Sequence, residues 1–512
     1  MIGMKPANSC NSRMSGLTNS NIVIGRKPMS SLNSTGRVSS CFSSQNSNRC
    51  FARMSSRLIS SDGIGRRCSR NISSSASSTG GATVERPVSP SLDKPLYIGL
   101  DVGTQGVKAL CYNTDTKEIV GRGAASFGLL PTNIKGRAEQ HPSSWIEGCA
   151  EATQKAIEGL DPEARARIRG VGVSGQQHGM VVLDSNKQVL RPAKLWCDVE
   201  AADEAAELSR AHGRMIVPSF TGGKLLWLKR HEPDVFAKVR HVMLPHDYVN
   251  FWLTGRIVAE AGDASGTTYY DMYNKKWDPA AMELIDEKLH QWVPELIGSN
   301  DIVGTLTPEA SSALGLPQDA VVSSGSGDNA MSALGVGCVD PGQMMLSLGT
   351  SGTLFAVTEI PLMDPSGAVC PFADATGKGL PLMCTLNCTM PPQEIASSFG
   401  MTHPQLTELA QQPENAQPGC GGVHFLPYLV GERTPNWPRA TGALLGLTPG
   451  VLSRPGLLYR AALEGASFSL LAGLHRMMQL GREHGTPDHA LLSPSELRLV
   501  GGGARNPLWY AC

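Results

Sequence analysis

Short apolar runs alternate with polar, glycine-rich segments through the chain after residue 95. The run Leu96–Leu100 passes into a polar turn, Asp101–Gly106, and apolar residues resume from Val107 to Tyr112. Another short run follows at Glu118–Val120. Runs of this length separated by turn residues are typical of strands joined as hairpins. The pattern therefore predicts an antiparallel meander whose first turn is rich in glycine.

The following segment changes from the period of a strand to that of a helix. Apolar residues recur at helical spacing from Pro142 to Leu160, and Ile168–Val173 then reads as a strand. This strand ends in the polar segment Ser174–Gly179, after which Met180–Leu183 is predicted to be another strand. Because strands and helices keep alternating beyond this point, we predict the α/β class.

Polar glycine turns recur later in the chain. Gly325–Ala330 follows a strand at 320–324, Ser347–Thr353 lies between apolar runs about 245 residues after the first turn, and Gly501–Ala504 follows a strand at 497–500. Such turns expose backbone N–H groups that suit phosphate, and Asp101 in the first turn suits Mg²⁺. Each turn alone could be an ordinary tight turn. The first turn with its acid, Ser347–Thr353 and Gly501–Ala504 together favour a phosphate site.

Charge is distributed unequally along a chain that is neutral as a whole, with 45 Lys and Arg against 45 Asp and Glu. Residues 1–84 carry eleven basic residues and one acid, so the other 428 residues carry 34 basic residues and 44 acids. We therefore interpret the chain as a basic leader and an acidic body. The length of the body indicates two domains.

The leader has the composition of a targeting segment. Its first 80 residues contain 22 serines and no acid before Asp62, and they lack the apolar core of a secretory signal. Scattered apolar residues cannot offset the entropy of ordering such a segment. We expect residues 1–84 to be a disordered transit peptide, directed to a plastid rather than a mitochondrion. A cytoplasmic protein with a disordered tail is the other interpretation.

The body lacks the marks of several functional classes. It has no apolar run of 18 residues and no basic stripe, so neither a membrane nor nucleic acid is an expected partner. Its nine cysteines show no paired CxxC spacing, which indicates reduced thiols rather than a zinc site. A P-loop is absent, and no acid follows Gly325-x-Gly327-x-x-Ala330 at the distance that a nicotinamide site requires. Nothing in the sequence indicates the oligomeric state.

Long strings of the body resemble the FGGY carbohydrate kinase family. The strings that resemble its two phosphate motifs, its adenosine motif and its two signatures are Ile98–Lys108, Leu346–Phe355, Leu497–Ala504, Ser219–His231, and Gly442–Leu447 with Ala461–Glu464. Two more, Gly175–Gly179 and Phe425–Pro435, resemble the members that phosphorylate xylulose. The resemblance covers essentially the whole body.

This resemblance implies a two-domain actin-like ATPase fold, ribonuclease H-like, with an interdomain active-site cleft. Residues 96–338 would form the sugar-binding N-terminal domain, and 342–512 an ATP-binding C-terminal domain that is incomplete at its end. The implied reaction uses ATP and Mg²⁺ to phosphorylate D-xylulose at O5, giving D-xylulose 5-phosphate. A kinase for another ketose or polyol, and a catalytically impaired sugar- or nucleotide-binding relative, are the alternatives.

The resemblance also implies roles for individual residues. Asp328 would be the catalytic base and a sugar contact, although the bare sequence favours a helix N-cap at this position. The other implied sugar contacts are Gln177, His178 and Asp198, and Asp101 would hold the metal. The residues implied to bind ATP are Asp101, Gly103, Thr104, Gln105, Lys108, Gly349, Thr350, Ser351, Gly502, Gly503 and Ala504.

One segment near the implied sugar site departs from the family pattern. Trp196-Cys197-Asp198-Val199-Glu200 stands where Trp-Asn-Asp-x-Arg is common, so that Glu200 replaces a cation. We therefore expect weaker hydrogen bonding to the sugar at this point, and we expect Trp196 to lie in the core.

Overall fold

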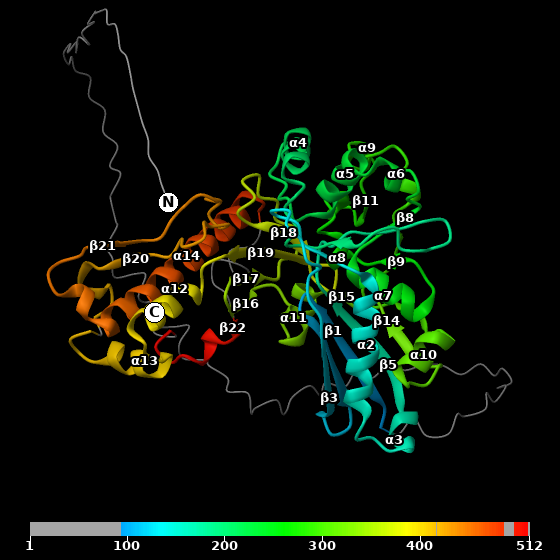
Figure 1. Ribbon diagram of the computed structural model, residues 1–512, viewed down its shortest axis with the longest axis horizontal. Coiled ribbons are helices and arrows are strands. Elements are labelled where there is room, and N and C mark those ends of the chain that lie inside the picture. Colours follow the sequence, from blue (N-terminus) through cyan, green and yellow to red (C-terminus); the bar gives the residue numbers. More distant parts are fainter. Residues whose placement is uncertain (1–93, 416, 486–495, 510–512) are drawn as a thin grey trace, which may run out of the picture. The chain divides into compact units, whose positions relative to one another are not determined.

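The computed structural model describes residues 94–415, 417–485 and 496–509, all within one compact unit, Ile59–Cys512 (Figure 1). The predicted leader, residues 1–84, lies outside the described residues. Described helices and strands alternate along the chain, as the apolar pattern predicted.

The first large sheet has β1 near its centre. Among the described residues its strand order is β13-β14-β5-β1-β2-β3, and β15 also pairs with β5. Pairing is antiparallel from β1 to β2 and from β2 to β3, which confirms the predicted meander, and parallel from β1 to β5. The strands are β1 (Leu96–Gly103), β2 (Gly106–Asn113), β3 (Glu118–Ser126), β5 (Ile168–Gly175), β13 (Ile302–Thr305), β14 (Val321–Ser323) and β15 (Ser326–Gly327).

Helix α2 (Pro142–Ile157) lies along this sheet (Figure 1). Its apolar face buries Trp145 and Cys149 against the strands. Two glycines of β3, Gly121 and Gly123, let the helix backbone come close, because a Cβ at either would collide with a carbonyl oxygen of α2. The helix ends three residues before the predicted Leu160, since a new helix begins after the Asp161 N-cap.

The second large sheet carries the later glycine segments. Its order in the described residues is β18-β19-β17-β16-β22, with β16 and β22 parallel and the other pairs antiparallel. Apolar side chains of α12 and α14 fill a core with this sheet. The elements are β16 (Gln343–Leu348), β17 (Gly352–Ala356), β18 (Cys370–Ala373), β19 (Gly379–Thr385), β22 (Glu496–Val500), α12 (Met390–Phe399), α13 (His403–Gln411) and α14 (Pro455–Glu483).

The remaining described elements are short. The paired strands are β4 (Glu139–Gln140) with β7 (Ala193–Lys194), β6 (Val181–Leu183) with β8 (His241–Met243), β9 (Val258–Ala259) with β12 (Glu295–Leu296), β10 (Tyr270–Asp271) with β11 (Lys276–Trp277), and β20 (His424–Leu426) with β21 (Ala443–Leu445). The helices are α3 (Pro162–Ala166), α4 (Ala202–His212), α5 (Thr221–His231), α6 (Pro233–Phe236), α7 (Pro245–Thr254), α8 (Ala261–Ala264), α9 (Pro279–Glu283), α10 (Pro308–Leu314) and α11 (Asp328–Gly335). The 3₁₀ turns are η1 (Leu289–Gln291), η2 (Cys420–Gly422), η3 (Val451–Ser453) and η4 (Gly503–Arg505).

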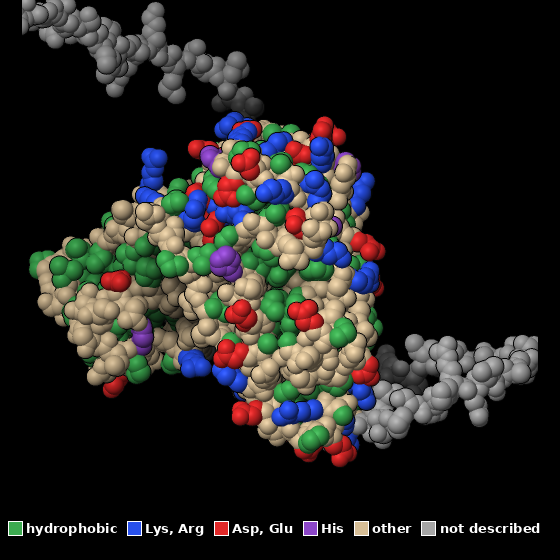
Figure 2. Space-filling view, turned by 45° about the vertical axis from the view of Figure 1, so that its right-hand side comes forward, with side chains coloured by type: hydrophobic (Ala, Val, Ile, Leu, Met, Phe, Trp, Pro, Cys, Tyr) green, Lys and Arg blue, Asp and Glu red, His purple; other side chains and the backbone are tan. Residues whose placement is uncertain are grey.

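The surface of the described part mixes charges of both signs. On the face in Figure 2, lysine and arginine side chains lie between acidic ones rather than in a continuous band. Among the described helices, including the 29-residue α14, none is both long and apolar enough to cross a bilayer. Each described cysteine is a free thiol.

We predict that Gly123→Ala destabilises the protein, because the added methyl group must push α2 away from β3. Overpacking of this kind costs roughly 1–3 kcal/mol of unfolding free energy, so the thermal unfolding midpoint should fall. Gly99→Ala in β1 is the matched control, since a Cβ there meets no atom within 4 Å. Equal midpoints for the two variants would contradict the close α2–β3 contact.

Candidate active site

The carboxyl ends of neighbouring parallel strands bring Asp101 and Asp328 to one edge of the first sheet. In the registers of β5, Ser174 lies opposite both Asp101 in β1 and Ser326 in β15, and Asp328 directly follows β15. The Ser174 hydroxyl donates a hydrogen bond to Oδ1 of Asp101 at 3.4 Å. Ligand sites in sheets with parallel strands are built at such carboxyl ends.

Asp328 is the first residue of α11, and it does not cap that helix. The N-cap is Gly327, and no side chain makes a capping hydrogen bond. The N-cap alternative for Asp328 is therefore wrong. Burial of the carboxyl group, together with the charge of Asp101, raises the pKa of Asp328 to about 7. Such a carboxylate can take a proton near neutral pH, which is the requirement for a general base.

Gln177 lies directly beside Asp328. Its Oε1 accepts a hydrogen bond from Nδ2 of Asn329 at 2.7 Å, whereas its buried Nε2 makes no hydrogen bond within the described residues. A Cβ on Gly327 would stand 2.5 Å from that nitrogen, so the side chain packs against bare backbone. Gln177 therefore has a fixed amide with one unused donor group next to the base. Asn329, which fixes it, was not predicted, although it directly follows Asp328 in sequence.

His178 occupies an aromatic sandwich close to the same segment. Its ring stacks on Phe372 of β18 and is tilted against Phe220, with both centroid distances 5.0 Å. Burial, with the positive charges of Lys224 and Arg433, holds the pKa of His178 well below its ordinary value. A neutral imidazole can both donate and accept hydrogen bonds, and Nδ1 has no hydrogen-bond partner among the described residues.

Asp198, in contrast, is fully buried in an ion-pair network. Lys194 Nζ lies 3.2 Å from its Oδ2, which also accepts a hydrogen bond from the Ala138 amide at 2.9 Å. The structure thus places Asp198 within this ion-pair network. Gln177, which binds Asn329, is the predicted sugar contact that lies next to Asp328.

Glu200 has its own cations within this network. Arg137 contacts both of its oxygens, at 2.8 and 2.9 Å, and Lys194 donates to Oε2 at 2.6 Å. Although partial burial opposes ionisation, these hydrogen bonds lower the pKa of Glu200 to about 2. Arg137, from a distant segment, and Lys194 therefore neutralise Glu200, an arrangement that local sequence could not reveal.

The first glycine turn is fixed by hydrogen bonds from side chains that the sequence did not single out. Thr104 Oγ1 donates to Gln176 at 3.1 Å, and Gln140 Nε2 donates to the Thr104 carbonyl at 2.7 Å. Trp196 donates from Nε1 to Thr104 Oγ1 at 2.9 Å and is 46% exposed, so its predicted place in the core is wrong. Its indole instead binds the turn, and the same Thr104 hydroxyl binds Gln176.

The other predicted ATP contacts near this turn lie in strands β1 and β2 or between them. Gly103 and Gly106 are paired residues of β1 and β2, with Thr104 and Gln105 between them. Lys108 lies opposite Asp101 in the hairpin, with Nζ 3.6 Å from Oδ2. The Lys108 side chain is largely exposed and that of Asp101 is half-exposed, so the two can move apart for a ligand.

The second glycine turn and the third glycine run lie together on the other large sheet. The parallel register pairs Ser347 with Val500, which brings Gly349, Thr350 and Ser351 to the same edge as the run that follows β22. A Cβ on Gly503 would stand 2.8 Å from Cβ of Leu348, so the run packs on the end of β16. Gly502 is exposed with no atom within 4 Å of a Cβ, and Ala504 is half-buried.

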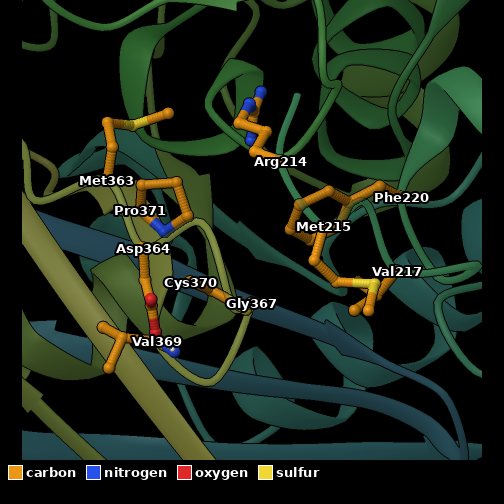
Figure 3. Close-up of a pocket in the computed structure, with 10 residues that line it drawn as sticks. All are labelled: Arg214, Met215, Val217, Phe220, Met363, Asp364, Gly367, Val369, Cys370 and Pro371. Carbon is orange, nitrogen blue, oxygen red and sulfur yellow. Dashed lines mark hydrogen bonds between the residues drawn. The ribbon is translucent and has the colours of Figure 1, made fainter. Parts of the chain in front are cut away.

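A small hollow lies beside the aromatic sandwich (Figure 3). Segment 214–220, which includes Phe220, faces segment 363–371, and the Met215 amide donates to the Pro365 carbonyl at 3.1 Å. The hollow holds little more than a water-sized molecule, so it is not a second substrate site.

Sequence comparisons match two successive domain profiles. The N-terminal domain of the FGGY family of carbohydrate kinases matches residues 96–335, and its C-terminal domain matches residues 344–512. The chain belongs to the FGGY family of carbohydrate kinases. Members of this family use ATP to phosphorylate an alcohol group of a sugar.

Relatives of this FGGY kinase cover most of its length. It is 37% identical over 429 residues to a xylulose kinase of Haemophilus influenzae, covering 81% of this chain and 84% of the relative. It is 37% identical to a xylulose kinase of Escherichia coli over 426 residues, with 81% and 83% covered. The crystal structure of a xyloylose kinase from Brucella ovis matches with a TM-score of 0.73 and 34% identity, covering 81% of this chain and 83% of that one. The predicted two-domain actin-like ATPase fold is confirmed.

We predict that Asp328→Asn stabilises the free kinase in a pH-dependent way. Because the folded-state pKa of Asp328 is raised to about 7, its ionisation in the folded protein costs stability, a cost that is absent below the unfolded pKa and complete above 7. The variant should therefore unfold at a higher temperature than wild type at pH 8, and this difference should disappear as the pH falls from 7 to 4. Thermal unfolding over a pH series measures it.

Asp101→Asn provides the internal check, because it removes the neighbouring charge that contributes to the raised pKa. In that background the effect of Asp328→Asn at pH 8 should be smaller. A difference between Asp328→Asn and wild type that does not change with pH would contradict the raised pKa.

Proposed function

We propose that the chain transfers the terminal phosphoryl group of ATP to O5 of D-xylulose, giving D-xylulose 5-phosphate and ADP. The observation that carries this proposal is the partly buried Asp328 carboxyl group, whose pKa is raised to about 7 and which lies beside the unused donor of Gln177. The xylulose kinases of Haemophilus influenzae and Escherichia coli, each 37% identical to this chain, support xylulose as the acceptor.

Phosphoryl transfer requires a base for the attacking hydroxyl and an aligned substrate. Asp328 would accept the O5 proton as the new P–O bond forms, because its pKa is near the working pH. Gln177 would donate from Nε2 to a sugar hydroxyl, and neutral His178 would donate or accept at Nδ1. These two groups orient the sugar, since Asn329 and the ring of Phe372 already fix their positions.

ATP would be held by backbone and hydroxyl groups of the glycine turns. Thr350 and Ser351 are exposed at the tip of the β16–β17 hairpin, and Gly502 leaves open space beside them for adenosine. Mg²⁺ fits at Asp101, whose half-exposed carboxylate offers the hard oxygen ligand that this ion prefers. When bound, Mg²⁺ neutralises charge on the phosphates.

The test is the rate of ADP release with D-xylulose compared with a panel of other ketoses and polyols. The highest kcat/KM is expected on D-xylulose, and Asp328→Asn should lower kcat at least about a hundredfold while sugar binding stays measurable. Asp319→Asn is the matched control, because Asp319 is 76% exposed and its one ion pair, to Arg169, lies on the surface. A different preferred sugar would overturn D-xylulose as the proposed substrate. Full activity of Asp328→Asn would overturn Asp328 as the proposed base.

We also propose that residues 1–84 direct the kinase to a plastid. Their serine-rich, arginine-rich and acid-poor composition supports this proposal. Residues 1–93 fused to a fluorescent protein should accumulate in plastids, and replacing the eleven basic residues with glutamine should leave the fusion in the cytoplasm. Accumulation of the unmodified fusion in mitochondria or in the cytoplasm would contradict the proposal.

A further inference from the structure

Side chains of two short helices make hydrogen bonds to the segment that leads into Asp328. The Ser324 carbonyl accepts hydrogen bonds from Nε2 of His246 at 2.7 Å and from Nδ2 of Asn250 at 2.8 Å, both in α7. The Ser326 hydroxyl donates to Oε1 of Glu260, the N-cap of α8, at 2.7 Å. The direction in which the chain enters α11 therefore depends on these contacts.

His246 fits beneath this segment because its neighbours have no side chains. A Cβ on Gly175 of β5 would stand 2.8 Å from Cβ of His246, and a Cβ on Gly325 would stand 2.7 Å from Nε2. Gly325 also has a φ of 62°, which side-chain-bearing residues rarely adopt. His246 thus packs against the backbone of β5 through its own backbone and Cβ, and against Gly325 through its ring.

The other ring nitrogen of His246 faces buried carboxylates. Nδ1 lies 3.4 Å from Oδ1 of Asp247 and 3.8 Å from Oδ2 of Asp263, which are ion-pair distances. Asp263 is fully buried, and neither of its oxygens has a hydrogen-bond partner within the described residues. Burial, together with the charges of Asp247, Glu260 and Asp328, raises the pKa of Asp263 well above its ordinary value and so favours its neutral form. Asp247 is therefore the charged partner of His246.

The surroundings of His246 favour its charged form. The titratable groups that face it are Asp247 on its own helix, Glu260 at the N-cap of α8, and Asp263 within α8. The residues that face it from β5 and from the Ser324–Ser326 segment are uncharged. Although burial lowers it, the nearby Asp247 carboxylate, together with the charge of Glu260, raises the pKa of His246 above its ordinary value.

We propose that His246 is a positioning residue for phosphoryl transfer, which rests on the proposed function of Asp328. Its imidazolium binds the Ser324 carbonyl on one side and lies at ion-pair distance from Asp247 on the other. The contact with Ser324 fixes the backbone that carries Asp328.

The experiment separates charge from packing with two variants. His246→Gln keeps a hydrogen-bond donor but no charge, and it should lower kcat roughly tenfold to a hundredfold through misplacement of the base, with KM changed less than about threefold. His246→Lys restores the charge and should recover most of kcat. His290→Gln, at an exposed site, is the matched control and should leave both constants unchanged.

The pH profile provides a readout that a merely structural role would not change. In wild type, kcat should decline as the pH rises through the folded-state pKa of His246, because the imidazolium is lost. In His246→Lys this decline should move to higher pH, since the ordinary pKa of lysine is about 10.4. Equal losses in the Gln and Lys variants, or an unmoved alkaline limb, would overturn the proposal.

Two measurements on the free protein do not depend on turnover. In wild type, the ¹⁵N spectrum of His246 should show a doubly protonated ring at pH 7. The carboxyl of Asp328 should titrate at higher pH in His246→Gln than in wild type. A neutral His246 ring would overturn the proposal even if a variant fails to fold, and so would a stoichiometric metal ion that chelation removes together with activity. Absence of sugar phosphorylation by wild type would instead overturn the proposed function.

Discussion

The site depends on limiting the contact of the partly buried Asp328 carboxyl group with water. Its position as the first residue of α11 favours the charged form through the helix dipole, yet burial prevails and raises its pKa to about 7. The same exclusion of water requires close packing against backbone, which Gly327 provides beside Gln177. The raised pKa of Asp328 and the fixed amide of Gln177 thus have one physical origin.

Three acids next to the predicted sugar contact Asp198, including Asp198 itself, share one buried cation. Lys194 contacts Glu139, Asp198 and Glu200, and its ammonium lies 3.9 Å from the ring centroid of Trp227. Buried ion pairs add little net stability, but loss of one partner is strongly destabilising. These groups therefore fix geometry more than they increase the overall free energy of unfolding.

Sequence predicted the local elements well because their periods are local. The β1–β2–β3 meander, α2 and the glycine turns follow directly from apolar spacing, and the family strings indicated Asp328, Gln177 and His178. The partners of these residues come from distant segments, so spacing could not predict them. Trp196 looks like a core residue until Thr104, 92 positions away, provides a hydrogen-bond acceptor at the surface. Asp198 matches a sugar contact of the family by sequence, but in the structure its carboxylate accepts hydrogen bonds from Lys194 and the Ala138 amide.

The parallel pairing of β1, β5 and β15 has a consequence for how the molecule is made. Asp101, Ser174 and Asp328 become neighbours only through strands that lie far apart in the chain. Closing such long loops costs entropy before any contact repays it, which slows folding of non-local sheets. During synthesis, β1 and β5 can pair as soon as they emerge. Asp328 reaches their shared edge only after about 150 further residues leave the ribosome. The chain therefore cannot bind sugar productively while it is still being translated through its first half.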